Sequence, residues 1–317
     1  MIFNSCNCVG LSSSISRRGV LCAGGAGFVS ALIATLVGTS QTAQAQALGS
    51  RVPEVDWLAV RMVTDNEVIL FVPSEKRGSL TIQRRTAPAT SPNAPPRTAL
   101  TGEFGLSMHA ESRRGNETRN VLVDFGYTPE TLLTNMSILE IDSSTFDALV
   151  LSHGHFDHFG GMVGFLAANK GKLKKNLPLY VGGEDCFCTR TVANGGQFGS
   201  LDRKAIADAE LLLMMAEGPA IVADHAFTTG KIPMVSSEKP LRASSERVGV
   251  VNGFGCFPEK MSPAKNTGTY IPDDFEHEIG TNFVVKGKGL VVLTSCSHRG
   301  VINTVRQAQA ASGVQKV

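Results

Sequence analysis

The sequence predicts an α/β fold, and three observations support it. Residues 148–151 form a short apolar run that is typical of a buried parallel strand, and Gly160-Gly161 with the apolar stretch 162–168 predicts a helix behind it. A second apolar strand at 289–294 precedes a predicted helix at 301–311. With 317 residues, 42% of them hydrophobic and 18% charged, the chain can bury the core of one catalytic domain.

Local patterns predict the other elements. Residues 57–64 alternate apolar and polar side chains, and with the apolar run 68–72 after Asp65-Asn66 they predict a β-hairpin. The proline-rich stretch 84–97 predicts an irregular loop. The remaining predictions are strands at 103–109, 120–124 and 281–285, and a helix that begins at Pro129 and runs to Leu139.

The N-terminus has the composition of a targeting segment. Ser16-Arg17-Arg18-Gly19 precedes the uncharged stretch 22–37, and a small-residue cleavage region follows at Ala43-Gln44-Ala45, or at Ala45-Gln46-Ala47. This arrangement is similar to a twin-arginine export signal. We expect residues 1–45 to be a signal peptide recognised by the twin-arginine export machinery, and residues 46–317 to be a periplasmic or extracellular catalytic domain. A stable membrane anchor is not expected, because the apolar stretch is short and rich in Gly, Ala and Ser.

Composition and cysteine usage limit the possible partners. The formal net charge is +2, aromatic residues make up 6% of the chain, and no basic run is interleaved with aromatics, so we expect no nucleic-acid partner. Cysteines in an exported protein permit a disulfide, but their spacing names no pair. Cys186 and Cys188 are too close for a likely bridge, and we interpret them as packing residues. The cysteines beyond the predicted signal are Cys186, Cys188, Cys256 and Cys296.

Residues 147–161 place three histidines and an aspartate directly after the predicted strand. His153 and His155 are two residues apart, so both imidazoles can face one metal from an extended loop. Asp157 and His158 follow where the chain turns into a helix, and they can serve a neighbouring metal position. Imidazole and carboxylate ligands without obligatory thiolates suit zinc, with iron or manganese as alternatives, and favour an open catalytic site. The sequence therefore predicts one or two divalent metal ions.

The pattern His-X-His-X-Asp-His, followed by Gly-Gly, resembles the metallo-β-lactamase superfamily. This resemblance implies a four-layer αββα sandwich with a one- or two-metal centre and a metal-held hydroxide as nucleophile. Over residues 57–311 the chain also resembles the branch of dihydropterin-ribofuranosylaminobenzene-phosphate-synthase-like proteins. The segments that carry this second resemblance are Val63-Thr-Asp65-Asn66, Glu103-Phe-Gly105-Leu106-Ser107, Val123-Asp124-Phe-Gly126 and Leu293-Thr-Ser-Cys296-Ser-His298-Arg-Gly300.

A second loop repeats the histidine spacing. Cys296 and His298 lie two apart at the carboxyl end of strand 289–294, as His153 and His155 do after the first strand. The resemblance implies that this loop contributes to the metal pocket. We predict that His298 is a ligand, while Cys296 is a ligand, a close neighbour of the metal, or a buried packing residue.

The resemblance also suggests further candidates for the pocket. His225 and Glu278 are possible metal ligands or hydrogen-bond partners of ligands; a capping or surface histidine and a solvated acidic turn are the alternatives. Asp274 and His277 lie in the same acidic segment as Glu278. His109 has no partner in sequence and is interpreted as structural.

The C-terminal part of the branch pattern is missing from this sequence. Members of the branch continue with a Gly-Gly-Phe-His segment and a late His-Cys-Thr/Ser-Gly loop, whereas this chain stops at Val317. The sequence leaves open whether the sandwich has its last βα layer and whether the second metal is held firmly.

The leading functional hypothesis is a metal-dependent hydrolase. A metal-bound hydroxide would attack a small-molecule ester, lactone, lactam or phosphoester. His153 and His155 would hold the first metal, Asp157 and His158 the second, and His298 would close the pocket; Asp157 would also be catalytic. Two alternatives stay open, namely a transferase of the ribofuranosylaminobenzene-phosphate-synthase type and a metal-binding protein without turnover.

Overall fold

The computed structural model describes residues 52–69, 72–84, 93, 99–192, 195–240 and 244–317, together with the backbone of β1 (Ala43–Gln44). The chain divides into two compact units, residues 1–40 and 41–317, and all described residues belong to the second. Apart from the backbone of β1, the predicted export signal lies outside the described residues. So does most of the predicted loop 84–97.

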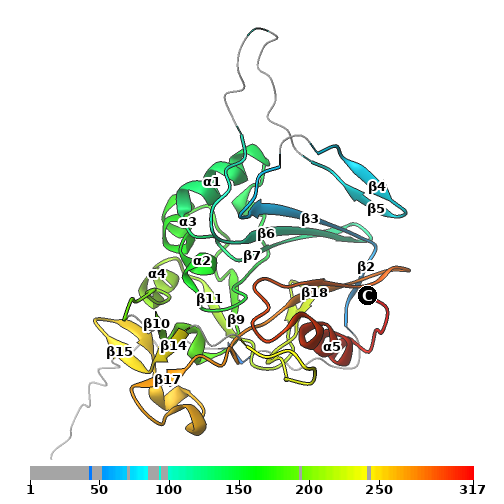
Figure 1. Ribbon diagram of the computed structural model, residues 1–317. Helices are drawn as coiled ribbons and strands as arrows, with labels where there is room; N and C mark the ends of the chain where they lie inside the picture. The colour runs from blue at the N-terminus through cyan, green and yellow to red at the C-terminus, as the bar shows by residue number, and fades with distance from the viewer. Residues whose placement is uncertain are drawn as a thin grey trace, which may run out of the picture. The chain divides into compact units, whose positions relative to one another are not determined.

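The larger sheet has the strand order β1-β11-β9-β8-β7-β6-β3 (Figure 1). Its strands β7, β8, β9 and β11 run parallel, whereas β3, β6 and β7 form an antiparallel meander. The predicted strand 148–151 is confirmed as the buried parallel strand β8. The strands are β3 (Trp57–Thr64), β6 (Ser107–Arg114), β7 (Glu117–Val123), β8 (Ala148–Val150), β9 (Pro178–Val181) and β11 (Leu212–Met215).

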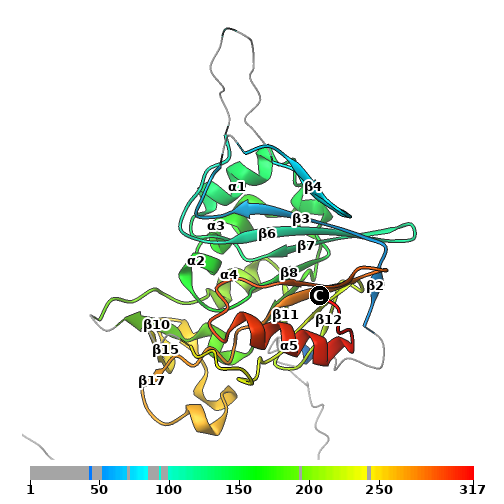
Figure 2. The ribbon, with the colours of Figure 1, turned by 45° about the vertical axis from the view of Figure 1, so that its right-hand side comes forward.

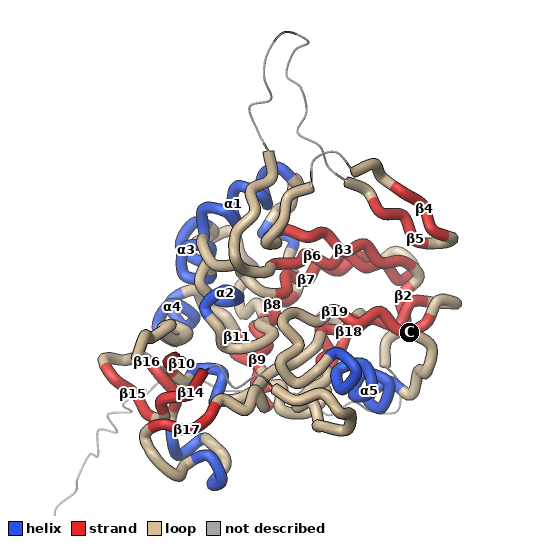
Figure 3. The backbone as a smooth tube through the Cα atoms, viewed as in Figure 1, coloured by secondary structure: helices blue, strands red, loops and turns tan. Residues whose placement is uncertain are grey.

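The second sheet has the order β12-β13-β18-β19, and β2 pairs in parallel with β18. A three-stranded sheet, β10-β14-β17, and two hairpins complete the strands, as the tube in Figure 3 shows. The second sheet consists of β12 (Ile221–Val222), β13 (Ala226–Thr228), β18 (Thr281–Val285), β19 (Gly289–Leu293) and β2 (Glu54–Val55). The others are β10 (Thr189–Val192), β14 (Ser244–Arg247), β17 (Tyr270–Pro272), β15 (Gly249–Val251), β16 (Phe254–Cys256), β4 (Glu75–Arg77) and β5 (Leu80–Ile82).

Helix α1 begins where the sequence supplies a cap. The side chain of Thr128 accepts a hydrogen bond from the backbone N–H of Thr131, and Pro129 occupies the first position of α1, as predicted. In the described part of the chain, no helix is long and apolar enough to span a bilayer. The helices are α1 (Pro129–Ile138), α2 (Phe156–Phe159), α3 (Met162–Ala168), α4 (Arg203–Asp208) and α5 (Val301–Ser312), with 3-10 turns η1 (Ser143–Thr145), η2 (Glu184–Phe187), η3 (Pro258–Lys260) and η4 (Pro263–Lys265).

Alternating side chains on the strands build four layers. On β8, Leu149 packs into the core beneath α1, α3 and α4, whereas Ala148 and Val150 face the core between the two sheets. On β18, Phe283 joins that central core, and Val284 packs toward α5 on the outer face. Figure 2 shows α1 and α3 on one side and α5 on the other. The fold is therefore α/β with the predicted αββα layering.

Three expectations are corrected. The hairpin predicted over 57–72 is wrong, because β3 pairs with β6, and Val68 and Ile69 lie in no strand. The strand predicted at 103–109 begins only at Ser107, since the preceding residues form the loop beside the site. Cys188 is not a simple packing residue: it forms a disulfide with Cys256, 68 positions away. Chain folding, rather than local spacing, brings these two cysteines together.

Candidate metal centre

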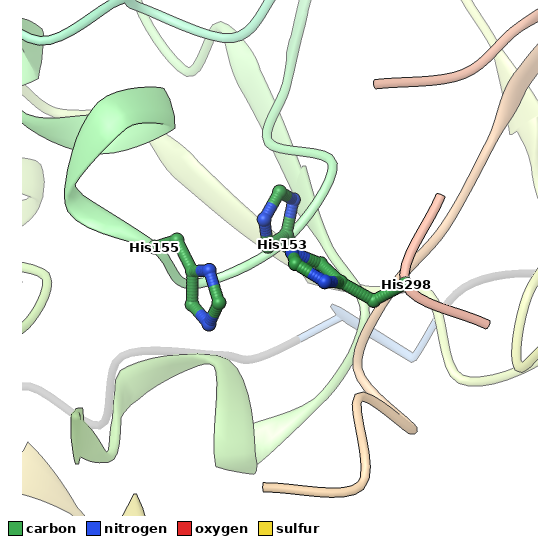
Figure 4. A group of neighbouring side chains, drawn as sticks. All are labelled: His153, His155 and His298. Carbon is green, nitrogen blue, oxygen red and sulfur yellow. The ribbon is translucent and has the colours of Figure 1, made fainter. Parts of the chain in front are cut away.

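Two loops bring the predicted ligands to one place. His153 lies in the loop after β8, His155 is the residue before α2, and Asp157 and His158 lie within α2. His298 lies between β19 and α5. Figure 4 shows the side chain of His298 extending from its own segment toward His153, with His155 on the same loop as His153. The loop that follows β8 in the larger sheet thus lies beside the loop that follows β19 in the second sheet.

We call His153, His155 and His298 the histidine centre. Their ring centroids lie 4.7 Å apart for His153 and His155, 4.9 Å for His153 and His298, and 4.8 Å for His155 and His298. One ring nitrogen of each lies within 4.8 Å of one ring nitrogen of the others. Three imidazoles at this spacing can serve one metal ion.

Ser152 determines which nitrogen of His153 is bare. Its hydroxyl lies 2.7 Å from Oδ2 of Asp124, which only accepts hydrogen bonds when ionised, so the hydroxyl donates there. It must then accept from Nδ1–H of His153, 2.9 Å away. The other nitrogen, Nε2, keeps a lone pair and is buried without a hydrogen-bond partner. Burial, and then the charge of His158, hold the pKa of His153 well below its usual range.

His298 presents a second buried nitrogen without a partner, again Nε2. Its ring stacks on Phe275 with centroids 4.0 Å apart and an interplanar angle of 12°. Burial, followed by repulsion from His155, lowers the pKa of His298 to about 3. Its loop is held by Glu278, whose carboxylate accepts the backbone N–H groups of His298 at 2.8 Å and Arg299 at 2.7 Å. Glu278 therefore anchors the loop through these two hydrogen bonds.

A second group of ligand-type atoms surrounds His158. Its Nδ1 lies 2.8 Å from Oδ2 of the fully buried Asp124, and its Nε2 lies 3.2 Å from both Sγ of Cys296 and Oδ2 of Asp157. Burial opposes a charge on this ring, but Asp124 and Asp157 outweigh it and raise the pKa of His158. Burial would raise the pKa of Asp157, yet His158 lowers it. Cys296 is exposed, so the interpretation as a buried packing residue is wrong.

These residues fit a divalent metal ion. Metals bind neutral imidazole through a nitrogen without hydrogen, and the histidine centre contains two ring nitrogens that are buried and have no hydrogen-bond partner. A buried polar atom without a partner costs free energy, which a bound cation would offset. His158 and Cys296 lie within ligand distance of each other and of His153, and Asp157 lies 3.2 Å from His158, so Asp157, His158 and Cys296 would hold a second ion beside the first. The number and identity of the ions stay predictions.

A third cluster of ligand-type residues already has its cations. Asp185, Glu246 and His277 also lie within ligand distance of one another. However, Arg190 pairs with Glu246 at 3.3 Å and Lys265 with Asp185 at 2.5 Å. We call these five residues the saturated cluster. Arg190 and Lys265 supply positive charge to the carboxylates, so this cluster is an ion-pair network, although Oε2 of Glu246 has no hydrogen-bond partner.

The structure places other candidates away from the histidine centre. His225 lies in the turn between β12 and β13, where its Nδ1 is 3.0 Å from Oγ of Ser112 and its Nε2 is 3.5 Å from Oε2 of Glu117. It contacts no residue of the centre, because β13 directs this turn toward β6 and β7. His109 bonds Asn120 at 3.0 Å, in keeping with the structural interpretation.

Sequence reasoning missed the residues that hold the ligands. Asp124 bonds Ser152 and His158, and Asp273 lies 3.2 Å from Nε2 of His155. Asp124 has a φ of 61°, a conformation that aspartate adopts more readily than most residues, at the carboxyl end of β7. An acidic residue at that strand end was the available signal. Nothing local pointed to Asp273.

An aromatic rim borders the histidine loop. Phe156 lies directly before Asp157, and its ring centroid is 6.1 Å from Phe104, 5.1 Å from Tyr127 and 4.8 Å from Phe198. Phe104 is 61% exposed and Tyr127 is 47% exposed. The loop that carries Phe104 contacts the metal-ligand loop, because the backbone N–H of Leu106 donates to the carbonyl oxygen of Asp157 at 3.1 Å.

Residues 113–183 match the family model of the metallo-beta-lactamase superfamily. The matched range includes His153 to His158. The chain is 27% identical over 221 residues, 68% of each chain, to the 7,8-dihydropterin-6-methyl-4-(beta-D-ribofuranosyl)-aminobenzene-5'-phosphate synthase of Methanocaldococcus jannaschii. An uncharacterized protein of that organism is 25% identical over 63% of this chain and 66% of its own length. The predicted resemblance to the superfamily, and to a protein of that synthase branch, is confirmed.

Solved structures to which the chain is similar include a quorum-quenching N-acyl homoserine lactone lactonase. It is 10% identical, has a TM-score of 0.36, and covers 67% of this chain and 77% of its own. An N-acyl homoserine lactone hydrolase with N-hexanoyl-L-homoserine at its catalytic metal centre is 11% identical, with a TM-score of 0.35 and coverage of 76% and 75%. The assignment of the fold class rests on the sheets and core layers described above, together with the family match.

Proposed function

We propose that the protein is a metal-dependent hydrolase of small molecules, with the histidine centre as its principal metal site. The observation that supports this most strongly is the pair of buried ring nitrogens without hydrogen-bond partners, on His153 and His298, beside a third imidazole. A divalent metal bound there lowers the pKa of water toward neutrality and polarises a carbonyl or phosphoryl oxygen. Zinc is the metal we propose, with iron or manganese as alternatives.

Asp157 is the residue we assign to proton transfer. The residue is 7% exposed, and its Oδ2 lies 3.2 Å from Nε2 of His158. It would orient the attacking water by accepting its proton, and would then pass that proton to the leaving group. Asp124, which bonds Ser152 and His158 together, would keep the loop in place during the reaction.

The aromatic rim supports a substrate with an apolar or aromatic part. Exposed aromatic surface beside a polar centre would gain free energy by covering such a group, because apolar burial contributes about 25 cal/mol per Å². Phe104 is the most exposed ring of the four. Phe104→Ala should raise KM for aryl or long-chain esters several-fold and leave KM for acetyl esters unchanged.

The test is hydrolysis by the purified protein after incubation with Zn²⁺, Mn²⁺ or Fe²⁺. Aryl esters, lactones, a chromogenic β-lactam and bis-(p-nitrophenyl) phosphate represent the candidate classes. Turnover of one class, abolished by chelation and by His155→Ala, would support the proposal. Stoichiometric metal without turnover of any class would favour the metal-binding alternative.

A transferase is the second candidate, favoured by the 27% identity to a protein named as a synthase. It predicts release of pyrophosphate from a phosphoribosyl donor in the presence of an aminobenzoate, with no hydrolysis of the esters. Incubation with both substrates distinguishes the two reactions.

We also propose that the protein is exported by the twin-arginine machinery. The disulfide between Cys188 and Cys256 supports this, since disulfides persist mainly in oxidising compartments. Fractionation of cells that express the full chain tests it. Replacement of Arg17 and Arg18 by lysine should leave the protein in the cytoplasm.

A further inference from the structure

Asp273 is a fully buried carboxylate whose hydrogen bonds converge behind the histidine centre. Its Oδ2 lies 3.2 Å from Nε2 of His155, 3.1 Å from Oγ of Ser244 and 3.3 Å from Nε of Arg190. Its Oδ1 accepts the backbone N–H of Phe275 at 3.2 Å. The side chain therefore has a partner on each oxygen, and one of these partners is a proposed metal ligand.

The carboxylate decides which nitrogen of His155 carries the hydrogen. An ionised aspartate only accepts hydrogen bonds. Burial would raise the pKa of Asp273, but the guanidinium of Arg190, 3.3 Å away, outweighs it and lowers this pKa, so the carboxylate is ionised. Nε2 of His155 must therefore be the N–H donor. Nδ1 is left with its lone pair, and a ring in this state can offer Nδ1 to an ion that His153 and His298 share.

Arg190 holds the carboxylate in place. The guanidinium is completely buried, and its Nη1 donates to the carbonyl oxygens of Cys186 at 3.0 Å and Cys188 at 2.8 Å. Cys188 is fixed to Cys256 by the disulfide. The position of Asp273 thus depends on a cross-linked segment rather than on a mobile side chain.

The same carboxylate also reaches a second histidine through Phe275. The hydrogen bond to the backbone N–H of Phe275 fixes the segment whose ring stacks on His298. The Phe275 ring also meets His155 edge-on at 5.3 Å. Asp273 therefore contributes to the orientation of two of the three imidazoles.

We propose that Asp273, held by Arg190, is a positioning residue that keeps His155 in the Nε2–H form and so prepares Nδ1 to bind the metal. This inference rests on the proposed metal centre. Hydrogen-bond partners of metal-bound histidines typically change metal affinity by about 10–100-fold. Nothing in the predicted ligand set assigned a role to Asp273.

The first measurement requires no metal. Long-range ¹⁵N–¹H correlation spectra of the full chain, labelled at histidine and freed of metal by chelation, report which ring nitrogen of each histidine carries hydrogen. His155 is expected in the Nε2–H form, identified by the loss of its signals in His155→Gln. An Nδ1–H ring at His155 would overturn the proposal, whether or not the protein proves to be a hydrolase.

The second measurement uses Asp273→Asn and a matched control, Glu246→Gln. Both residues pair with Arg190 at 3.3 Å and both are fully buried, but only Asp273 contacts His155. Zn²⁺ affinity, measured by competition with a chromogenic chelator, should fall roughly 10–100-fold for Asp273→Asn and less than about threefold for Glu246→Gln. The Co²⁺ absorption spectrum should change only in Asp273→Asn. Equal losses in both variants would mean that the buried network acts on stability alone, and would refute the positioning role.

Discussion

The histidine centre and the saturated cluster contain similar residues in one domain, yet they differ in how their polar atoms are satisfied. In the saturated cluster, Arg190 and Lys265 supply positive charge to Asp185 and Glu246 at hydrogen-bond distance. In the histidine centre, two buried ring nitrogens have no hydrogen-bond partner, and the ion pair found there among the described residues joins His155 to the carboxylate of Asp273 rather than to a lysine or arginine. The comparison teaches that proximity of ligand-type residues is not enough, and that unmet demand for a cation distinguishes a candidate metal site from an ion-pair network.

The largest predicted effect comes from removing one ligand of the histidine centre. His153→Ala removes a ligand and should lower metal affinity by more than about 100-fold, beyond what loss of an outer hydrogen-bond partner causes. Elemental analysis after gel filtration measures the bound metal. His277→Gln is the matched control, because it removes a buried histidine from the saturated cluster. Equal metal loss in both variants would contradict the distinction between the two clusters.

The next effect tests whether the saturated cluster is structural. Arg190→Met leaves Asp273 and Glu246 buried without their shared cation, and should lower the free energy of unfolding by about 3–5 kcal/mol. Urea unfolding followed by circular dichroism measures it. Arg113→Met removes an ion pair whose arginine is 55% exposed, and should cost under about 1 kcal/mol. A stable Arg190→Met protein would mean that the cluster has another source of charge compensation.

A smaller effect concerns the group around His158. Cys296→Ser replaces a soft sulfur 3.2 Å from Nε2 of His158 by a weaker oxygen donor. We expect binding of a second metal to weaken about tenfold while the first stays bound, which isothermal titration with Zn²⁺ resolves as two steps. Cys186→Ala controls for loss of a buried free thiol that is outside the proposed ligand set. An unchanged titration would remove Cys296 from the proposed ligand set.

Much of the fold was predictable, because local patterns determine it. The apolar runs that became β8, β18 and β19, the Pro129 helix start and the helix behind Gly160-Gly161 all follow from short-range rules. The pairing partner of β3 does not follow from short-range rules, because β3 pairs with β6, whose residues lie more than 40 positions away. The disulfide between Cys188 and Cys256 was unpredictable for the same reason.

The candidate site divides in the same way. The loop that carries His153, His155, Asp157 and His158 is contiguous, so its spacing could be interpreted directly. The groups that hold it, Asp124 and Asp273, follow β7 and β17, and their contacts with this loop could not be inferred from the spacing within it. A carboxylate that orients a ligand looks like any other acidic residue until the fold places it behind the ring.

The smallest predicted effect extends the comparison to a buried histidine whose two nitrogens are both satisfied. Nδ1 of His109 lies 3.3 Å from Nη1 of Arg61, and Nε2 lies 3.0 Å from Oδ1 of Asn120. Burial is the main cause that lowers the pKa of His109; the hydrogen bond to Asn120 and the charge of Glu111 oppose it, while Arg61 adds to it.

The direction of this shift fixes the pH dependence of stability. The pKa of His109 is lower in the folded than in the unfolded state, so the unfolded state binds more protons near neutral and mildly acidic pH. The contribution of the neutral ring is therefore complete above the unfolded pKa of about 6.5 and is lost as pH falls through the folded pKa. Melting temperatures of the wild type and His109→Gln should converge by a few degrees between about pH 7.5 and pH 5. Other buried histidines titrate equally in both proteins and cancel in this difference. Parallel melting curves would show that Arg61 and Asn120 do not keep His109 neutral, and would leave the unsatisfied nitrogens of the histidine centre as the main source of acid sensitivity.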